Sequence, residues 1–213
     1  MAAVGNMTAL RADTFNNLQL NAGVVIKDLV YTGTGAPATA DDLKTLIAGI
    51  VGGTITGKGT LLGATRGGGT FTVTRETRTP EIDGMRYGFI GSDFVDSTDA
   101  YLSTTLLEVT PENIATLLAT GVATTSGSVT TVKMNTAIAD TDYLNNICWV
   151  GNIGSSGKLA LIVLKNAINT ADFTFTYADK GEGTLAAEFH ARQANVDDYD
   201  EAPFEVLFFN PAA

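Results

Sequence analysis

Apolar and polar residues alternate along several short segments, in the period-two pattern of a strand that buries one face. This alternation occurs in residues 70–74, 172–177 and 184–192. Residues 159–164 and 204–209 are apolar nearly throughout, which is typical of strands covered on both faces. Turn residues separate such segments at 126–127, 152–157 and 179–183. Short strands joined by turns predict a mainly-β fold, a β-sandwich or a β-barrel.

Residues 41–51 depart from this pattern and show the spacing of an amphipathic helix. The apolar residues at helical spacing are Leu43, Leu46, Ile47 and Ile50. Thr39 and Asp42 are placed to form a capping box at its start. We therefore expect one helix packed on the β-structure.

A second, shorter helix is expected after Thr110, which can cap it, with Pro111 at the first helical position. Its apolar stripe consists of Ile114, Leu117 and Leu118. Gly121 is the residue expected to end it.

Residues 52–69 are rich in Gly and Thr and are expected to form a long loop. The part around Lys58 comes close to a phosphate-binding loop, but Gly59 stands where that motif requires Ser or Thr. A surface loop is therefore the favoured interpretation over nucleotide binding. Because glycines leave the backbone free, we expect this loop to be mobile in a free subunit.

Length and charge favour a single-domain protein that binds neither nucleic acid nor anionic membranes. The chain has 213 residues, which suits one domain over residues 1–213. Asp and Glu outnumber Lys and Arg by 23 to 13, and a net charge of −10 repels nucleic acid and anionic membranes. No signal-peptide pattern occurs near the start, so a soluble protein folded in a cytoplasm is expected.

The residues with candidate chemistry do not form a known catalytic pattern. His190 lies beside Glu188 and Arg192 on the polar face of an expected strand, which favours a surface or interface imidazole paired with a carboxylate. Cys148, the only cysteine, cannot form a disulfide within the chain and is expected to pack in the core. No catalytic residue, cofactor or metal site is predicted.

An acidic cluster near the C-terminus consists of Asp197, Asp198, Asp200 and Glu201. It lacks the spacing and the fixed glycine of a calcium-binding loop. A solvated turn, or an acidic patch that faces a partner, is the favoured interpretation.

Several segments resemble, in their order along the chain, the major tail proteins of long-tailed, non-contractile bacteriophages (siphophages). They are Gly-Ala-Thr-Arg-Gly-Gly-Gly-Thr-Phe-Thr-Val from Gly63, Arg-Glu-Thr-Arg-Thr-Pro-Glu-Ile-Asp-Gly from Arg75, Leu-Leu-Glu-Val-Thr-Pro-Glu-Asn from Leu106, Asn-Ile-Cys-Trp-Val-Gly from Asn146 and Ala-Asp-Lys-Gly-Glu-Gly from Ala178. The resemblance extends over about residues 14–210.

The resemblance implies a tail-tube fold, in which a β-sandwich or barrel carries one or two flanking helices. It implies homohexameric rings that stack into a hollow tube, a tape-measure protein inside that tube, and genomic DNA that passes through without specific binding. It also implies contacts with distal tail and tail-terminator proteins, assembly in the host cytoplasm, a place in the virion and no enzymatic activity.

Within such a tube, residues 1–20 are expected to form an N-terminal arm, residues 52–69 a loop between rings, and residues 203–213 a C-terminal strand and tail. The basic residues expected to contact neighbouring subunits are Lys58, Arg66, Arg75, Arg78 and Arg86. The acids expected to face the lumen or an interface are Asp197, Asp198, Asp200 and Glu201.

A secreted or cell-surface adhesion module of immunoglobulin-like type is the alternative from another class. It would share the Thr-rich strands and the acidic charge. A hydrolase built on a β-sandwich is a third, weaker option.

Overall fold

The computed structural model describes residues 14–19, 21–154, 157–198 and 201–211. Residues 1–13 and 20 of the expected N-terminal arm, and residues 212–213 of the expected tail, lie outside this part. Strands make up 43% of the chain and helices 14%, which confirms the expected mainly-β class. No helix in the described ranges is long and apolar enough to cross a membrane.

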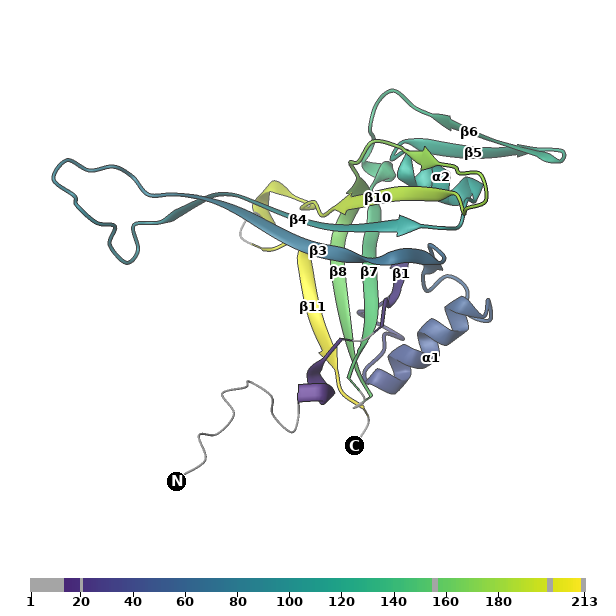
Figure 1. The fold of residues 1–213 in the computed structure, drawn as a ribbon, viewed down its shortest axis with the longest axis horizontal. Helices are drawn as coiled ribbons and strands as arrows, with labels where there is room; N and C mark the ends of the chain where they lie inside the picture. The colour runs from purple at the N-terminus through teal and green to yellow at the C-terminus, as the bar shows by residue number, and fades with distance from the viewer. Residues whose placement is uncertain (1–13, 20, 155–156, 199–200, 212–213) are drawn as a thin grey trace.

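Seven strands form a continuous antiparallel path through the main sheet (Figure 1). In spatial order they are β2 (Thr60–Leu61), β1 (Val24–Lys27), β7 (Leu144–Ile153), β8 (Lys158–Asn169), β10 (Thr184–His190), β4 (Phe94–Leu106) and β3 (Thr65–Arg78). Off this path, β11 (Phe204–Phe209) pairs with β8, and β9 (Phe175–Thr176) pairs with β10.

The long strand β8 connects two layers of this sheet. Most of it pairs with β7 and β11, whereas its last two residues, Ile168 and Asn169, pair with β10. The main core fills the space between the layers: Ile147 and Leu164 come from one layer, and Phe189 from the other. Burying these apolar faces against each other is the main force that holds the layers together.

Helix α1 (Ala40–Val51) packs its apolar stripe on the other face of the β1-β7-β8 layer and forms a second core there. The expected capping box is confirmed, since the Thr39 hydroxyl accepts from the Asp42 amide and the Asp42 carboxylate accepts from the Thr39 amide. Cys148 is fully buried in this core, as expected, and burial raises the pKa of its thiol.

Helix α2 (Pro111–Leu117) begins as expected, with the Thr110 hydroxyl accepting from the Asn113 amide at 3.1 Å. Its expected end at Gly121 is wrong. The helix stops at Leu117 because Ala119 takes a left-handed conformation, with φ of 59°. Gly121 instead begins β5 (Gly121–Ser126), which pairs with β6 (Val129–Met134) in a separate two-stranded sheet.

The expected turns lie between strands. Gly127, with φ of 62°, joins β5 to β6, and residues 179–183 join β9 to β10. Residues 155–156 of the turn between β7 and β8 lie outside the described part. The described part of the chain also contains three short 3₁₀ helices: η1 (Thr14–Asn17), η2 (Asp140–Asp142) and η3 (Val196–Asp198).

The two apolar segments differ in burial. Residues 159–164 lie in β8 and are covered on both faces, as expected, because α1 packs on one face and the β10-β4 layer on the other. The same expectation is wrong for β11. Its residues Val206 and Phe208 are 45% and 68% exposed, because only one face of this strand meets the core.

The alternation predicted in residues 184–192 is confirmed, since β10 buries alternate side chains. The strand predicted over residues 172–177 is wrong in its extent, because only Phe175 and Thr176 form a strand. The aromatic residues of this segment, expected to cover the core, are exposed: Phe173, Phe175 and Tyr177. Strand β9 pairs only with the beginning of β10 and so lies beyond the sheet face that the core covers.

The loop expected over residues 52–69 is wrong in its extent. Strand β2 and the first part of β3 fall within it, and Leu62 is only 1% exposed in the main core. Ile55 packs directly over Gly49 of α1, where any Cβ atom would clash with the Ile55 side chain. Ile55 and Leu62 thus pack on their own chain. A strand rather than a helix follows Lys58, which removes the phosphate-loop interpretation.

Candidate assembly surfaces

The most prominent surface feature is a two-stranded arm that the long strands β3 and β4 carry away from the two layers (Figure 1). Its strand pairs run from Thr74 opposite Asp99 to Arg78 opposite Phe94, with a register shift after Glu76. Almost all of these residues are exposed. Because an isolated two-stranded ribbon is marginally stable in water, this arm is expected to gain stability from a partner.

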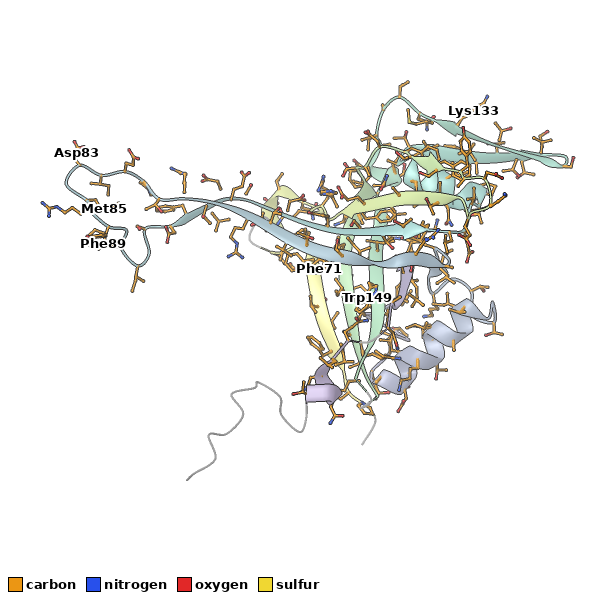
Figure 2. The ribbon with its side chains drawn as sticks, viewed as in Figure 1. Phe71, Asp83, Met85, Phe89, Lys133 and Trp149 are labelled. Carbon is orange, nitrogen blue, oxygen red and sulfur yellow. The ribbon has the colours of Figure 1, made fainter. Side chains whose placement is uncertain are left out.

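The tip of the arm, residues 79–93, places large apolar side chains in solvent. The exposed fractions are 65% for Ile82, 83% for Tyr87, 70% for Phe89 and 108% for Ile90. Local hydrogen bonds shape the tip: the Met85 amide donates to the Ile82 carbonyl and the Ser92 amide to the Phe89 carbonyl. Figure 2 shows Asp83, Met85 and Phe89 at this end of the molecule. A concentrated apolar surface of this kind is typical of a binding site.

Two of the arginines expected to contact neighbouring subunits form ion pairs within the chain. Arg66 Nη1 lies 3.1 Å from Glu182 Oε2, and Arg78 Nε lies 2.7 Å from Asp96 Oδ1. The Arg78 guanidinium also lies over the Phe94 ring, 5.9 Å from its centroid. All four charged side chains of these pairs are well exposed, so each pair contributes at most about 1 kcal/mol and can be exchanged for another partner.

Arg75 and Arg86 are exposed on the arm, and neither takes part in an ion pair within the described part of the chain. Lys58 is half-buried near α1, where its carbonyl accepts from the Val30 amide at 2.9 Å. These residues and Arg66 and Arg78 were expected to contact neighbouring subunits because they lie close together in the sequence. The structure divides the group, since Arg75, Arg78 and Arg86 lie on the arm and Lys58 does not.

The acidic cluster lies in the segment between β10 and β11, near the base of the arm, where Glu201 lines the same surface cleft as Arg75 and Asp96. Asp197 is exposed in η3, the backbone of Asp198 lies in the same 3₁₀ helix, and Asp200 lies outside the described residues. Glu201 accepts from Lys165, whose ammonium lies 2.6 Å from a carboxylate oxygen of Glu205. The hydrogen bond with Glu205 is the main cause that raises the pKa of Lys165 above its usual range.

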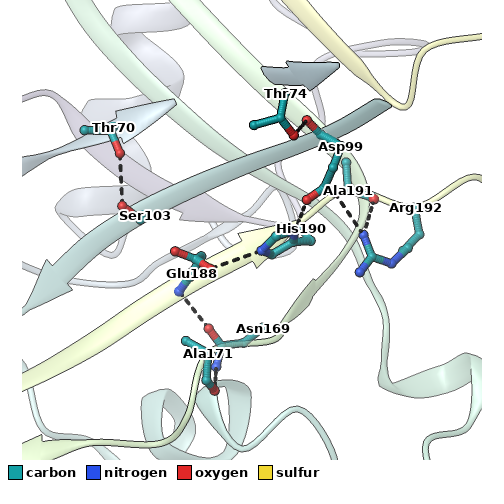
Figure 3. Close-up of polar contacts among 10 residues, drawn as sticks. All are labelled: Thr70, Thr74, Asp99, Ser103, Asn169, Ala171, Glu188, His190, Ala191 and Arg192. Atoms are coloured by element: carbon teal, nitrogen blue, oxygen red, sulfur yellow. Dashed lines mark hydrogen bonds and ion pairs between the residues drawn. The ribbon is translucent and has the colours of Figure 1, made fainter. Parts of the chain in front are cut away.

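A polar face covers the outer side of β3, β4 and β10 (Figure 3). On it, His190 Nδ1 lies 2.7 Å from Asp99 and Nε2 lies 3.2 Å from Glu188, while the Tyr101 ring stacks on the imidazole. Arg192 reaches the second oxygen of Asp99 at 3.5 Å. Both ring nitrogens are engaged by carboxylates, so the arrangement matches the expected paired imidazole and not a catalytic base poised on a nucleophile.

Among the strands with an unpaired edge in the described ranges are β3 and β11. Strand β3 ends the sheet order, and β11 pairs on one side only, with β8. On β11 the exposed Val206 and Phe208 lie beside that open edge. Open edges with apolar side chains are surfaces on which another chain can add a strand.

A cavity of about 220 Å³ is lined by Phe71, Leu102, Trp149 and Ile162 together with the backbone of Gly69 (Figure 2). This volume is below the roughly 300–1,000 Å³ of most ligand pockets. In the part of the chain that the structure describes, no group of three or more His, Cys, Asp and Glu could hold a metal ion. The cavity therefore gives no ligand assignment.

We found no match to the chain among protein-family models, and a search of curated proteins found none either. The tail-protein resemblance therefore rests on the order of the sequence segments. The arm was the surface that sequence reasoning missed. Its sequence signal was the group of large apolar residues interspersed with Gly84, Gly88 and Gly91: Ile82, Met85, Tyr87, Phe89 and Ile90.

Proposed function

We propose that this protein is the structural subunit of a siphophage tail tube, and not an enzyme. In this function, subunits form homohexameric rings that stack into a hollow tube in the host cytoplasm and then in the virion. The tube encloses the tape-measure protein, ends on the distal tail and tail-terminator proteins, and conducts genomic DNA during ejection.

The observation that carries this proposal is the arm with its apolar tip. A stable monomer would have little use for a ribbon that exposes Tyr87, Phe89 and Ile90 to water, because exposed apolar surface of this kind promotes association. A subunit that must bind the next copy gains from it. The inner parts of β3 and β4, which contribute Phe71 and Leu102 to the main core, anchor the base of the arm.

The charge of the chain supports the same function. A net charge of −10 gives each subunit a surface that phosphate groups do not bind, which suits a passage through which DNA must slide. We expect acids to outnumber basic residues on the inner wall, with the acidic cluster as candidates. Submicromolar affinity for duplex DNA at low salt would contradict this expectation.

Arm removal tests the function. Replacing residues 77–96 with Asn-Gly joins Glu76 to Ser97, which are already register partners, through a two-residue hairpin turn. Because the removed residues lie outside both cores, the variant should fold with nearly the unfolding free energy of the parent. In electron micrographs the parent should form rings or hollow filaments and the shortened variant should stay monomeric.

The matched control replaces Lys180 and Gly181, in the turn between β9 and β10, with the same Asn-Gly and leaves the arm intact. If the armless variant forms tubes as the parent does, the arm is not an assembly element. If the parent at high concentration forms only single particles, the tail-tube function itself is wrong, and an adhesion module becomes the better interpretation.

A further inference from the structure

The β5–β6 hairpin is a second projecting ribbon, and its surface differs in charge from the rest of the chain. Lys133 is the only charged residue between Glu112 and Asp140 in a protein with 23 acids. The hairpin forms its own two-stranded sheet, and its side chains are exposed along nearly its whole length. It is therefore a surface that an acidic copy can approach with little electrostatic repulsion.

One face of this hairpin combines an apolar surface with the positive charge. In the observed register, Val122 lies opposite Lys133 and Ser126 opposite Val129, so these four side chains point to the same face. Val122 and Val129 are 47% and 62% exposed. We call this surface the Lys133 face.

The tip of the arm has the complementary composition. Residues 79–93 carry three acids, Glu81, Asp83 and Asp93, against the single Arg86, and they expose the apolar side chains described above. Elsewhere on an acidic subunit this tip would meet like charges, which disfavours most other docking positions.

The two surfaces lie at opposite ends of the long axis of the molecule (Figure 1), and Figure 2 shows Asp83 and Lys133 at these two ends. A contact between them can therefore form only between different copies. It would be heterologous, head to tail, which is the type of contact that builds rings and filaments. A hairpin paired with its own counterpart would instead bring two Lys133 residues together without a carboxylate.

From this juxtaposition we infer that the Lys133 face of one subunit is the docking site for the arm tip of the next subunit. The inference rests on the proposed function and specifies which surfaces of two copies meet. Apolar side chains of the tip cover Val122 and Val129, and Lys133 pairs with a carboxylate of the tip. The open edges of β5 and β6 can in addition accept backbone hydrogen bonds from the bound segment.

Charge reversal tests the pairing. Lys133→Glu should raise the critical concentration for assembly by about tenfold or more, because an attraction becomes a repulsion at a partly desolvated contact. Combining it with Glu81→Lys and Asp83→Lys should restore much of the loss. Lys180→Glu, at another exposed lysine, changes the net charge equally and should have a small effect. Equal effects of Lys133→Glu and Lys180→Glu would overturn the inference.

Crosslinking tests the contact independently of charge. Because Cys148 is fully buried, engineered surface cysteines can be joined selectively. Subunits with Tyr87→Cys mixed with subunits with Val129→Cys should give covalent dimers in assembled samples. Mixtures of Tyr87→Cys with Ala48→Cys, on the exposed side of α1, should not.

The outcomes separate this inference from the function beneath it. Tubes that form normally without the Tyr87–Val129 crosslink would leave the tail-tube function standing and refute this docking site. A parent chain that forms no tubes under any condition would refute both.

Discussion

Phe89 and Phe189 have the same side chain in opposite surroundings, and truncation to alanine should affect them in opposite ways. Phe189 is fully buried in the main core, where Phe→Ala creates a cavity and costs about 3–5 kcal/mol of unfolding free energy. This is a large part of the roughly 5–15 kcal/mol that stabilises a typical domain. Phe89 is 70% exposed at the arm tip, and its truncation should change the stability of the monomer by less than about 0.5 kcal/mol.

The effect of Phe89→Ala should instead appear in assembly. Full burial of a phenylalanine side chain contributes about 1.5–3 kcal/mol. Because Phe89 is 70% exposed in the monomer, burying the rest of it in a subunit contact would contribute about 1–2 kcal/mol to the free energy of association. This corresponds to about a 5- to 30-fold change in the association constant.

Urea denaturation of dilute monomer measures the first effect, and the critical concentration from sedimentation measures the second. Phe189→Ala should mainly lower the unfolding free energy measured in urea. Phe89→Ala should change only the critical concentration measured by sedimentation. If Phe89→Ala lowers stability by more than about 1 kcal/mol, the tip is packed on its own chain, and if the critical concentration is unchanged, the tip is not buried in assembly.

Two further predictions concern the cores. Asn146 of β7 is 7% exposed, and its side-chain amide accepts from the Leu29 amide and donates to the Leu29 carbonyl. Asn146→Ala should therefore lower the unfolding free energy in urea by about 1–3 kcal/mol. An exposed control, Asn135→Ala, should lower it by less than about 0.5 kcal/mol. Stability should also fall at alkaline pH. Burial raises the pKa of Tyr31 and Cys148, and the Glu205 hydrogen bond raises that of Lys165, so the folded chain keeps protons that the unfolded chain releases. The contribution is complete below about pH 8.5, the unfolded pKa of a cysteine, and declines above it. Melting temperatures between pH 7 and pH 11 measure this, and Cys148→Ala should move the onset of the decline toward pH 10; an onset that stays unchanged would mean that the thiol does not contribute.

Local signals in the sequence predicted much of the fold. The capping box at Thr39, the Thr110-Pro111 start of α2 and the alternation in residues 184–192 were right because each depends on neighbours in the chain or on one buried face. Residues 159–164 were right because α1 and the β10-β4 layer cover the two faces of this part of β8.

The errors lie where burial depends on distant residues or on another chain. Leu62 and Ile55 gave no periodic signal among the glycines around them. Contacts with remote strands nevertheless bury Leu62, and contacts with α1 partly bury Ile55. The arm was missed because a ribbon with solvent on both faces has no alternation to detect. At β11 the apolar pattern of Val206 and Phe208 exceeds what this chain alone covers. Under the proposed function, a neighbouring subunit covers that face.

Cryo-electron microscopy of concentrated or polymerised protein tests the central proposal most directly. We expect sixfold rings stacked into a hollow tube, with the arm tip of each subunit buried against the next copy. Single particles of the isolated subunit at all concentrations, closed rings of another order, or tubes in which the arm tip remains exposed to solvent would contradict it.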